Sequence, residues 1–219
     1  MVVATTGQRG SVTTKVHYER RFGALDMVEV ILPLSSVSAG SRGRSTSIGD
    51  IALEYKRTLA HSLDRGNILS LTGEFVLPTG SARRGLGKGY AVFEPFATFG
   101  QRLPREGFIQ SQAGMALPLE DGHDNEVFWR VAMGKTFEQT RFGRMWSPML
   151  EMLGARALTT DARNTWDLLP GMQVTLNTRQ HVRLAGGVRL PVTDARTRKK
   201  SVIVYLLWDW YEGGFLQGW

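Results

Sequence analysis

Ionisable side chains recur near the middle of segments in which every second residue is apolar. Carboxylates and guanidinium groups placed in this way can pair across a narrow space and set an electric field inside it. The pattern therefore predicts an interior lined by charge rather than a catalytic centre. The residues expected to line that interior are Glu19, Glu29, Asp50, Glu54, Lys56, Glu74, Glu94, Arg130, Glu151, Asp167, Arg183 and Arg189.

Other residue types give little support for catalysis or metal binding. Four histidines lie far apart, and none has the His-x-x-x-His spacing of a zinc-binding helix. We expect two of them, His17 and His181, to make hydrogen bonds in the interior. The chain has no cysteine and no Gly-x-Ser-x-Gly motif, so the usual nucleophile signatures are missing. We therefore expect no enzyme activity, no cofactor and no metal.

The glycine-rich segment 80–89 superficially resembles a phosphate-binding loop. It reads Gly-Ser-Ala-Arg-Arg-Gly-Leu-Gly-Lys-Gly. In a phosphate-binding loop the lysine is followed by a helix whose amides point at the phosphate, but Lys88 is followed by glycine and a strand-like pattern. We expect a mobile outer loop here.

The elements that position the charged residues are predicted to be strands. Apolar and polar residues alternate over segments separated by clusters of Gly, Ser, Asp, Asn and Arg, and no apolar run approaches the roughly 18 residues of a membrane-spanning helix. Residues 1–219 are expected to form one all-β domain. The expected strands are residues 12–21, 25–36, 47–59, 67–78, 89–101, 107–118, 126–138, 144–156, 164–176, 180–191 and 199–211.

The connections between these segments alternate in length. Short ones fall near residues 23, 64–66, 104–106, 140–143 and 177–178, and longer polar ones fall at 38–46, 80–88, 120–125, 159–163 and 193–198. Transmembrane barrels have this alternation, with short turns on one side of the membrane and long loops on the other. An antiparallel barrel also needs an even strand number, so we expect a twelfth strand before residue 7, truncated or continued upstream of Met1.

Three prolines interrupt the expected strands. Pro95, Pro148 and Pro170 lie well inside them, where a residue without an N–H removes a hydrogen bond from the ladder. We therefore expect a β-bulge at each.

Alternate residues of each segment separate two chemically different faces. One face is apolar over the middle of most segments and includes Leu71, Val131 and Leu206, whereas the other carries the charged residues. In a transmembrane barrel the apolar face points outward to lipid. In a soluble barrel it would point inward, and alternation alone does not decide between the two. Tryptophans near the segment ends, as in interfacial girdles, favour the membrane arrangement.

Several short stretches resemble outer-membrane β-barrels of the meta-pathway phenol-degradation and transporter-like type. They are Tyr18–Gly23, Gly49–Asp50 with Lys56, Glu74–Gly80 followed by Gly85–Gly87, Leu169–Gly171, Gly187–Pro191 and Leu207–Trp210. The resemblance implies an outer-membrane barrel with a role in transport and implies no catalytic site. The chain departs from the usual outer-membrane pattern of a terminal aromatic residue on the last strand, because residues 211–219 extend beyond it.

The sequence thus predicts an up-and-down barrel in the bacterial outer membrane, acting as a passive or weakly selective channel for small solutes. The alternative is a barrel plugged by its own charges, acting as a scaffold or partner in an envelope complex. The segment after Met1 lacks the features of a secretion signal, so an exported protein would be represented here by a mature form or a fragment.

The expected partners are lipid and lipopolysaccharide. The net charge of +7 would suit nucleic acid, but the basic residues are spread along the chain and concentrate in the connections. We expect phosphate groups of lipopolysaccharide to contact the outer loops, with simple solvation of the same charges as the alternative. The residues concerned are Arg42, Arg44, Arg83, Arg84 and Lys88.

Overall fold

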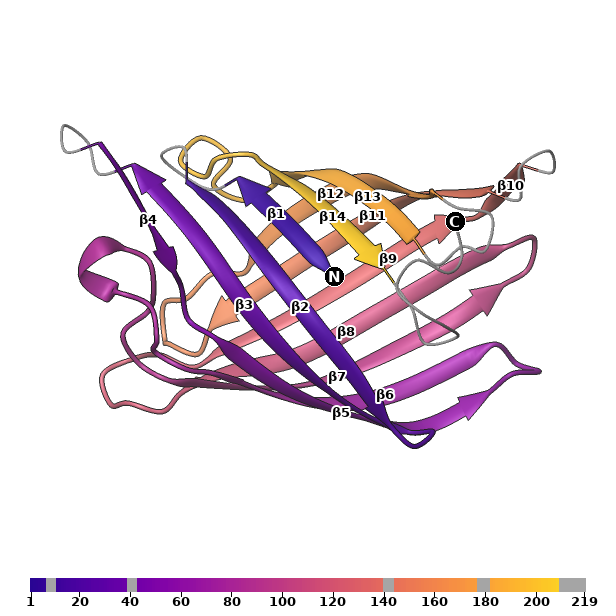
Figure 1. Ribbon diagram of the computed structural model, residues 1–219, viewed down its shortest axis with the longest axis horizontal. Helices are drawn as coiled ribbons and strands as arrows, with labels where there is room; N and C mark the ends of the chain where they lie inside the picture. The colour runs from indigo at the N-terminus through magenta and orange to yellow at the C-terminus, as the bar shows by residue number, and fades with distance from the viewer. Residues whose placement is uncertain (7–10, 39–42, 140–143, 177–181, 209–219) are drawn as a thin grey trace.

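Strands account for nearly all of the regular structure in the computed structural model (Figure 1). The structure describes residues 1–6, 11–38, 43–139, 144–176 and 182–208. The strands are β1 (Val2–Thr6), β2 (Val12–Phe22), β3 (Asp26–Ser38), β4 (Arg44–Ile48), β5 (Ala52–Ser62), β6 (Asn67–Val76), β7 (Val92–Leu103), β8 (Gly107–Pro118), β9 (Glu126–Lys135), β10 (Phe137–Gln139), β11 (Arg144–Ala157), β12 (Thr165–Thr175), β13 (Val182–Pro191) and β14 (Ser201–Trp208).

These strands close into an antiparallel barrel with twelve strand positions. Every neighbour pair is antiparallel, β14 pairs β1, and pairing of β11 with β9 completes the circuit. The segments β4 and β5 share one position beside β3, and β9 and β10 share another beside β11. The predicted all-β fold and the predicted twelve strands are therefore confirmed, and β1 is the short first strand.

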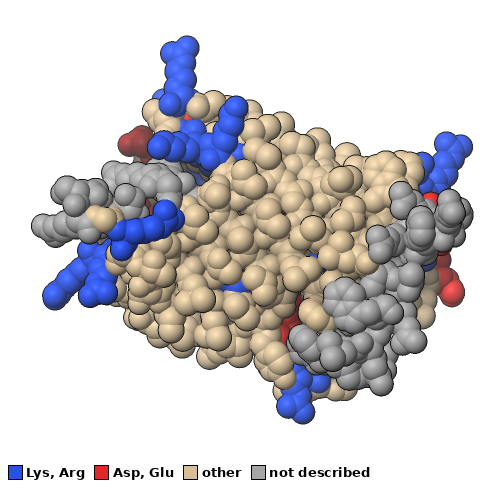
Figure 2. All heavy atoms as spheres, turned by 45° about the horizontal axis from the view of Figure 1, so that its top comes forward, with Lys and Arg blue, Asp and Glu red and all other residues tan. Residues whose placement is uncertain are grey.

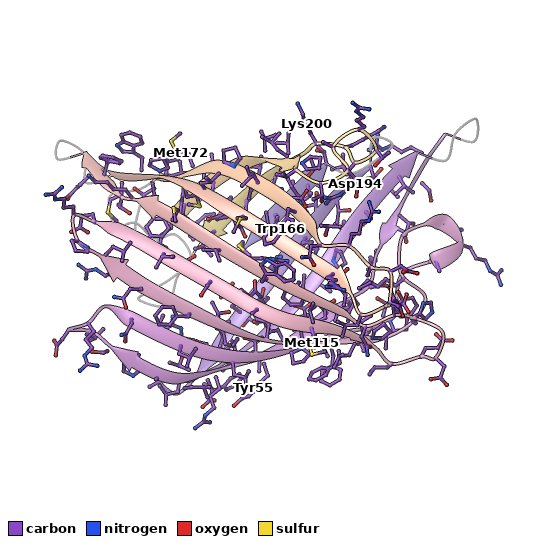
Figure 3. The ribbon with its side chains drawn as sticks, turned by 180° about the vertical axis from the view of Figure 1, so that it is seen from behind. Tyr55, Met115, Trp166, Met172, Asp194 and Lys200 are labelled. Atoms are coloured by element: carbon purple, nitrogen blue, oxygen red, sulfur yellow. The ribbon has the colours of Figure 1, made fainter. Side chains whose placement is uncertain are left out.

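Alternation along the strands separates an outer from an inner face. On β3, the even-numbered Leu32 and Leu34 are exposed, whereas the odd-numbered Glu29, Ile31 and Ser35 are buried. Side chains of successive strand residues point to opposite faces, so this difference distinguishes the outside of the barrel from its interior. Figure 3 shows Tyr55 and Met172 on different sides of the barrel, and both side chains are among the exposed ones.

The predicted orientation of the apolar face is confirmed for the described strands. Leu71, in the middle of β6, is 50% exposed, although leucine is usually buried in a soluble fold. Val131 and Leu206 belong to the same outer face, because Val131 pairs with Met152 and Leu206 with Leu184. One residue differs: Val182 has the outward position on β13, yet it is only 2% exposed. The predicted residues His181 and Trp210 lie outside the described part of the chain.

The β-bulges expected at the prolines are not found in the described strands. The register of β7 with β8 is the same on both sides of Pro95, and that of β12 with β13 is the same on both sides of Pro170. At both prolines a few residue pairs are missing from the hydrogen-bond ladder, and pairing resumes beyond them in the same register. Pro148 lies opposite the break between β9 and β10. A missing N–H thus leaves a gap on one side of each strand and leaves the registers unchanged.

A register shift does occur in the hairpin of β5 and β6. Thr58 pairs with Ser70, whereas Ala60 pairs with Leu69, so Leu59 is an extra residue on β5. Such a bulge changes which face the following residues occupy. On the side of the bulge away from the turn between β5 and β6, Glu54 pairs with Glu74, so the two glutamates lie on the same face of the sheet.

Gly154 gives a test of packing on the outer face. It lies on β11 between Trp129 on β9 and Trp166 on β12, whose rings meet edge to face at 5.1 Å. A Cβ atom at Gly154 would lie 2.2 Å from the Trp129 ring. The alanine variant therefore has to displace that indole, and we expect Gly154→Ala to lower the free energy of unfolding by about 1–3 kcal/mol.

Urea unfolding in detergent micelles, followed by tryptophan fluorescence, measures this change. Gly186→Ala is the matched control, because an added Cβ there finds no atom closer than 3.7 Å. Equal stability of the two variants would contradict the packing described for Gly154.

Candidate functional site

Five glutamates lie side by side across five neighbouring strands. Glu19 on β2 opposes Glu29 on β3, and Glu29 also opposes Glu54 on β5. Glu54 in turn opposes Glu74 on β6, and Glu74 opposes Glu94 on β7. Opposed residues of antiparallel strands have Cβ atoms roughly 4.5–5.5 Å apart. We call this row, Glu19, Glu29, Glu54, Glu74 and Glu94, the acidic ladder.

The acidic ladder faces the interior of the barrel. Glu74 on β6 interacts electrostatically with Lys15 and His17 on β2, although β3 and β5 lie between these strands. Side chains of strands that are not neighbours approach one another across the concave face of a sheet. The predicted interior position of the glutamates is therefore the observed one.

Two buried polar atoms beside the ladder have no hydrogen-bond partner within the described chain. His17 Nδ1 lies 2.5 Å from Glu29 Oε1, and its other ring nitrogen, Nε2, is buried and unpartnered. Thr72 is 2% exposed, lies opposite Lys56, and its hydroxyl is also unpartnered. Buried polar atoms without a partner are exceptions in folded proteins. His17 Nε2 and the Thr72 hydroxyl therefore each have a hydrogen-bonding position that the described residues leave unfilled.

Arginines are concentrated on the other side of the barrel. Asp167 on β12 is buried, and its Oδ2 accepts hydrogen bonds from Arg189 Nε at 2.8 Å and from Arg198 Nη2 at 2.7 Å. Glu151 on β11 interacts with the guanidinium groups of Arg130 and Arg189. We call Arg130 on β9 together with Arg183 and Arg189 on β13 the arginine wall. All of these predicted residues lie on the inner face.

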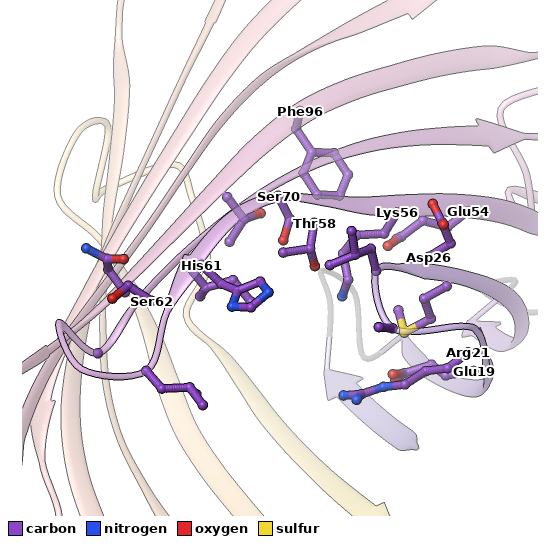
Figure 4. A pocket seen from close by; sticks show the side chains of 18 of the residues that line it. Glu19, Arg21, Asp26, Glu54, Lys56, Thr58, His61, Ser62, Ser70 and Phe96 are labelled. Carbon is purple, nitrogen blue, oxygen red and sulfur yellow. The ribbon is translucent and has the colours of Figure 1, made fainter.

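A cavity of about 670 Å³ opens at the short-turn end of the barrel interior (Figure 4). Its lining combines charged side chains, among them Glu19, Arg21, Glu54 and Lys56, with the apolar surface of Phe96. A second cavity of about 500 Å³ is lined from β2 by His17, Glu19 and Arg21 and from β13 by Arg183. Groups from the ladder and from the arginine wall thus reach the same space.

Asp50 has a different place from the one predicted for it. It lies between β4 and β5, outside the strands, and its two carboxylate oxygens accept the backbone N–H groups of Gly80 and Lys88 at 2.9 and 2.6 Å. A Cβ atom at Gly87 would collide with this carboxylate, and one at Gly80 would collide with the carbonyl oxygen of Leu86. Asp50 therefore anchors a loop at the long-loop end of the barrel rather than lining the middle of the interior.

The same contacts correct the expectation of a mobile loop at residues 80–89. This loop contains the short helix η3 (Ala82–Arg84), and its Leu86 is only 4% exposed. Thr79 donates its hydroxyl to the carbonyl of Gly49 and accepts the N–H of Ile51, so the break between β4 and β5 also holds the loop. The sequence could not show this, because the contacts join segments about thirty residues apart.

The basic residues assigned to the outer loops divide into groups. Arg83 and Arg84 are exposed in η3, and Arg44 begins β4 and donates to Ser36. Lys88 instead places its ammonium 3.6 Å from Glu94, at the end of the acidic ladder. Arg42 lies outside the described residues.

Two polar contacts of the interior were not expected from the sequence. Arg198 lies in the long connection after β13, and its guanidinium reaches back to Asp167 in the barrel interior. Tyr205 on β14 donates its hydroxyl to Gln173 on β12 at 2.6 Å. Alternation along β14 places Tyr205 on the inner face opposite Ala185, and this was the available signal for it.

No helix within the described ranges is long and apolar enough to cross a membrane. Over the same residues, no cluster of three or more His, Asp or Glu side chains is arranged to hold a metal ion. No family model matches the chain, and no curated protein matches it. Its function must therefore be inferred from the charges and cavities of the barrel itself.

The anchoring role of Asp50 can be tested by amide hydrogen exchange. Hydrogen bonds to a charged acceptor contribute about 1.5–3 kcal/mol, so Asp50→Ala should accelerate exchange at the Gly80 and Lys88 amides roughly ten- to a hundredfold. Asp194→Ala, in another loop of the same end, is the control and should leave both rates unchanged. Unaltered exchange in Asp50→Ala would show that other contacts hold the loop.

Proposed function

We propose that this chain is a bacterial outer-membrane barrel that conducts small solutes through a charge-lined lumen, and that it belongs with the transporter-like barrels whose sequences it resembles. The observation that carries the proposal is the outward orientation of the apolar face. Leu71, Leu150, Met152 and Val204 are each more than 40% exposed in the middle of their strands. Such a surface is costly in water but suits the hydrocarbon of a bilayer.

Aromatic pairs at both ends of the strands support this placement. Phe75 stacks on Phe93, and Trp129 meets Trp166, near the long-loop end. Phe137 stacks on Trp146 near the short-turn end. Aromatic rings favour the two interfaces of a membrane. Figure 2 is consistent with this: Lys and Arg gather at the two ends of the face in view, and the surface between them is almost free of charge.

Solvent contact inside the barrel favours a channel over a plug. Lys15, Glu19, Arg21 and Arg130 occupy inner positions, yet all four are exposed. A plug would have to shield such groups from solvent. Charged groups that line a hydrated passage set which ions enter it.

Planar-bilayer recording tests the channel and its selectivity together. We expect stepwise conductance and a preference for cations, because the acidic ladder concentrates five carboxylates. A unit charge contributes about 1 kcal/mol at 4 Å in water, so Glu74→Gln should lower the cation-to-anion permeability ratio by about two- to fivefold.

Asp194→Asn removes an exposed loop carboxylate and should leave the ratio unchanged. Persistent silence of correctly folded wild-type barrels, checked by heat-modifiable migration on gels, would contradict the channel and favour the plugged scaffold.

Lipopolysaccharide contact is a separate part of the proposal. Arg83 and Arg84 are exposed at the long-loop end, where guanidinium groups can bind phosphate in bidentate geometry. In liposomes, lipopolysaccharide should raise the melting temperature of the wild type. In the Arg83→Ala/Arg84→Ala variant we expect this gain to fall by about 2–4 °C, or about 1 kcal/mol for a chain of this length.

The Arg65→Ala/Lys135→Ala variant serves as control, because it removes two cations from the opposite end. An equal gain in all three proteins would leave only solvation as the role of the loop arginines.

A further inference from the structure

The acidic ladder and the arginine wall lie on opposite sides of the barrel. In the circuit of twelve positions, β6 and β13 are separated by the same number of strands in either direction. Glu74 is the eighth residue of β6 and Arg189 the eighth of β13, and both strands have ten residues and start at the short-turn end. Glu74 and Arg189 therefore face each other across the lumen at similar depth.

Charges from both sides of the barrel line one cavity of its interior. The Arg189 side chain is 42% exposed despite its bonds to Asp167, and Arg130 is exposed as well. In the cavity of about 500 Å³, Glu19 of the ladder and Arg183 of the wall are both lining residues. A solute in this space is within reach of acidic and basic groups at once.

A further observation beside the ladder points to a polar ligand. The hydroxyl of Thr72 has no hydrogen-bond partner among the described residues, although the side chain is 98% buried. It lies on the inner face two residues before Glu74. An unsatisfied hydroxyl at such a site is available to a group that can donate or accept a hydrogen bond.

Charges of opposite sign on opposite sides favour one class of solute. A simple cation gains only at the acidic ladder and a simple anion only at the arginine wall, and an uncharged solute gains little from either. A zwitterion that lies across the lumen gains at both of its ends, and this gain offsets the loss of its hydration. Resting on the proposed channel, we infer that the lumen selects small zwitterionic solutes, with the cationic group toward the acidic ladder and the anionic group toward the arginine wall.

Two isomeric probes test this inference. β-Alanine is a zwitterion and lactamide is its uncharged isomer, so the two differ in charge at the same atomic composition. Swelling of proteoliposomes gives the permeability to each, after subtraction of protein-free liposomes. For the wild type we expect a β-alanine-to-lactamide ratio of roughly three or more.

Neutralising either side should reduce that ratio to about one. The variants are Glu54→Gln/Glu74→Gln for the ladder and Arg130→Gln for the wall, with Arg84→Gln in the outer loop as a control that keeps the wild-type ratio. Heat-modifiable migration verifies that each variant is a closed barrel.

The possible outcomes separate this inference from the channel proposal. A wild-type ratio of one or less in liposomes permeable to both probes would overturn the inference and leave the channel in place. A ratio that stays high in both the ladder and the wall variants would also overturn it. Impermeability to both probes, together with silent bilayers, would overturn the channel and the zwitterion selectivity with it.

Discussion

The hydrogen-bond ladder between the first strand, β1, and the last, β14, closes the sheet into a barrel and is the constraint on which the other features of this molecule depend. Closure leaves no sheet edge along the joined strands and fixes each strand relative to two neighbours. Because side chains alternate in direction, a fixed register also determines which residues meet outside and which meet inside. The apolar exterior and the charged interior are thus two consequences of one backbone arrangement.

The acidic ladder illustrates how register creates an electrostatic feature that no single segment contains. Each of its strands contributes one of the five glutamates, and only the cross-strand pairing brings them into a row. Like charges in a row repel one another, so the arrangement costs stability. Lys15, Lys56 and the His17–Glu29 contact offset part of this cost. Keeping such a costly row is easier to explain by a role in the lumen than by a role in folding.

Alternation and connection length were sufficient to predict most of the fold. They predicted the strand number, the antiparallel order and the inner position of residues such as Glu74 and Arg130, because these depend on local period and on even-numbered closure. They failed where distant segments meet. The break between β4 and β5 depends on Thr79, and the position of Asp50 depends on the amides of a loop about thirty residues away. The contact of Arg198 with Asp167 has the same origin, since a loop residue returns to a strand that alternation treats separately.

The extra residue Leu59 determines which face of the barrel the charged residues of β5 occupy. If the pairing set by the turn, in which His61 meets Ile68, continued without interruption, Glu54 would stand opposite Phe75 rather than Glu74. Leu53 and Tyr55 would then project into the passage, and Glu54 and Lys56 would project toward the surroundings of the barrel. One extra residue in this hairpin thus places charged rather than apolar side chains of β5 on the inner face of the barrel. Chain length between turns, and not composition alone, therefore determines which side chains line the interior of this barrel.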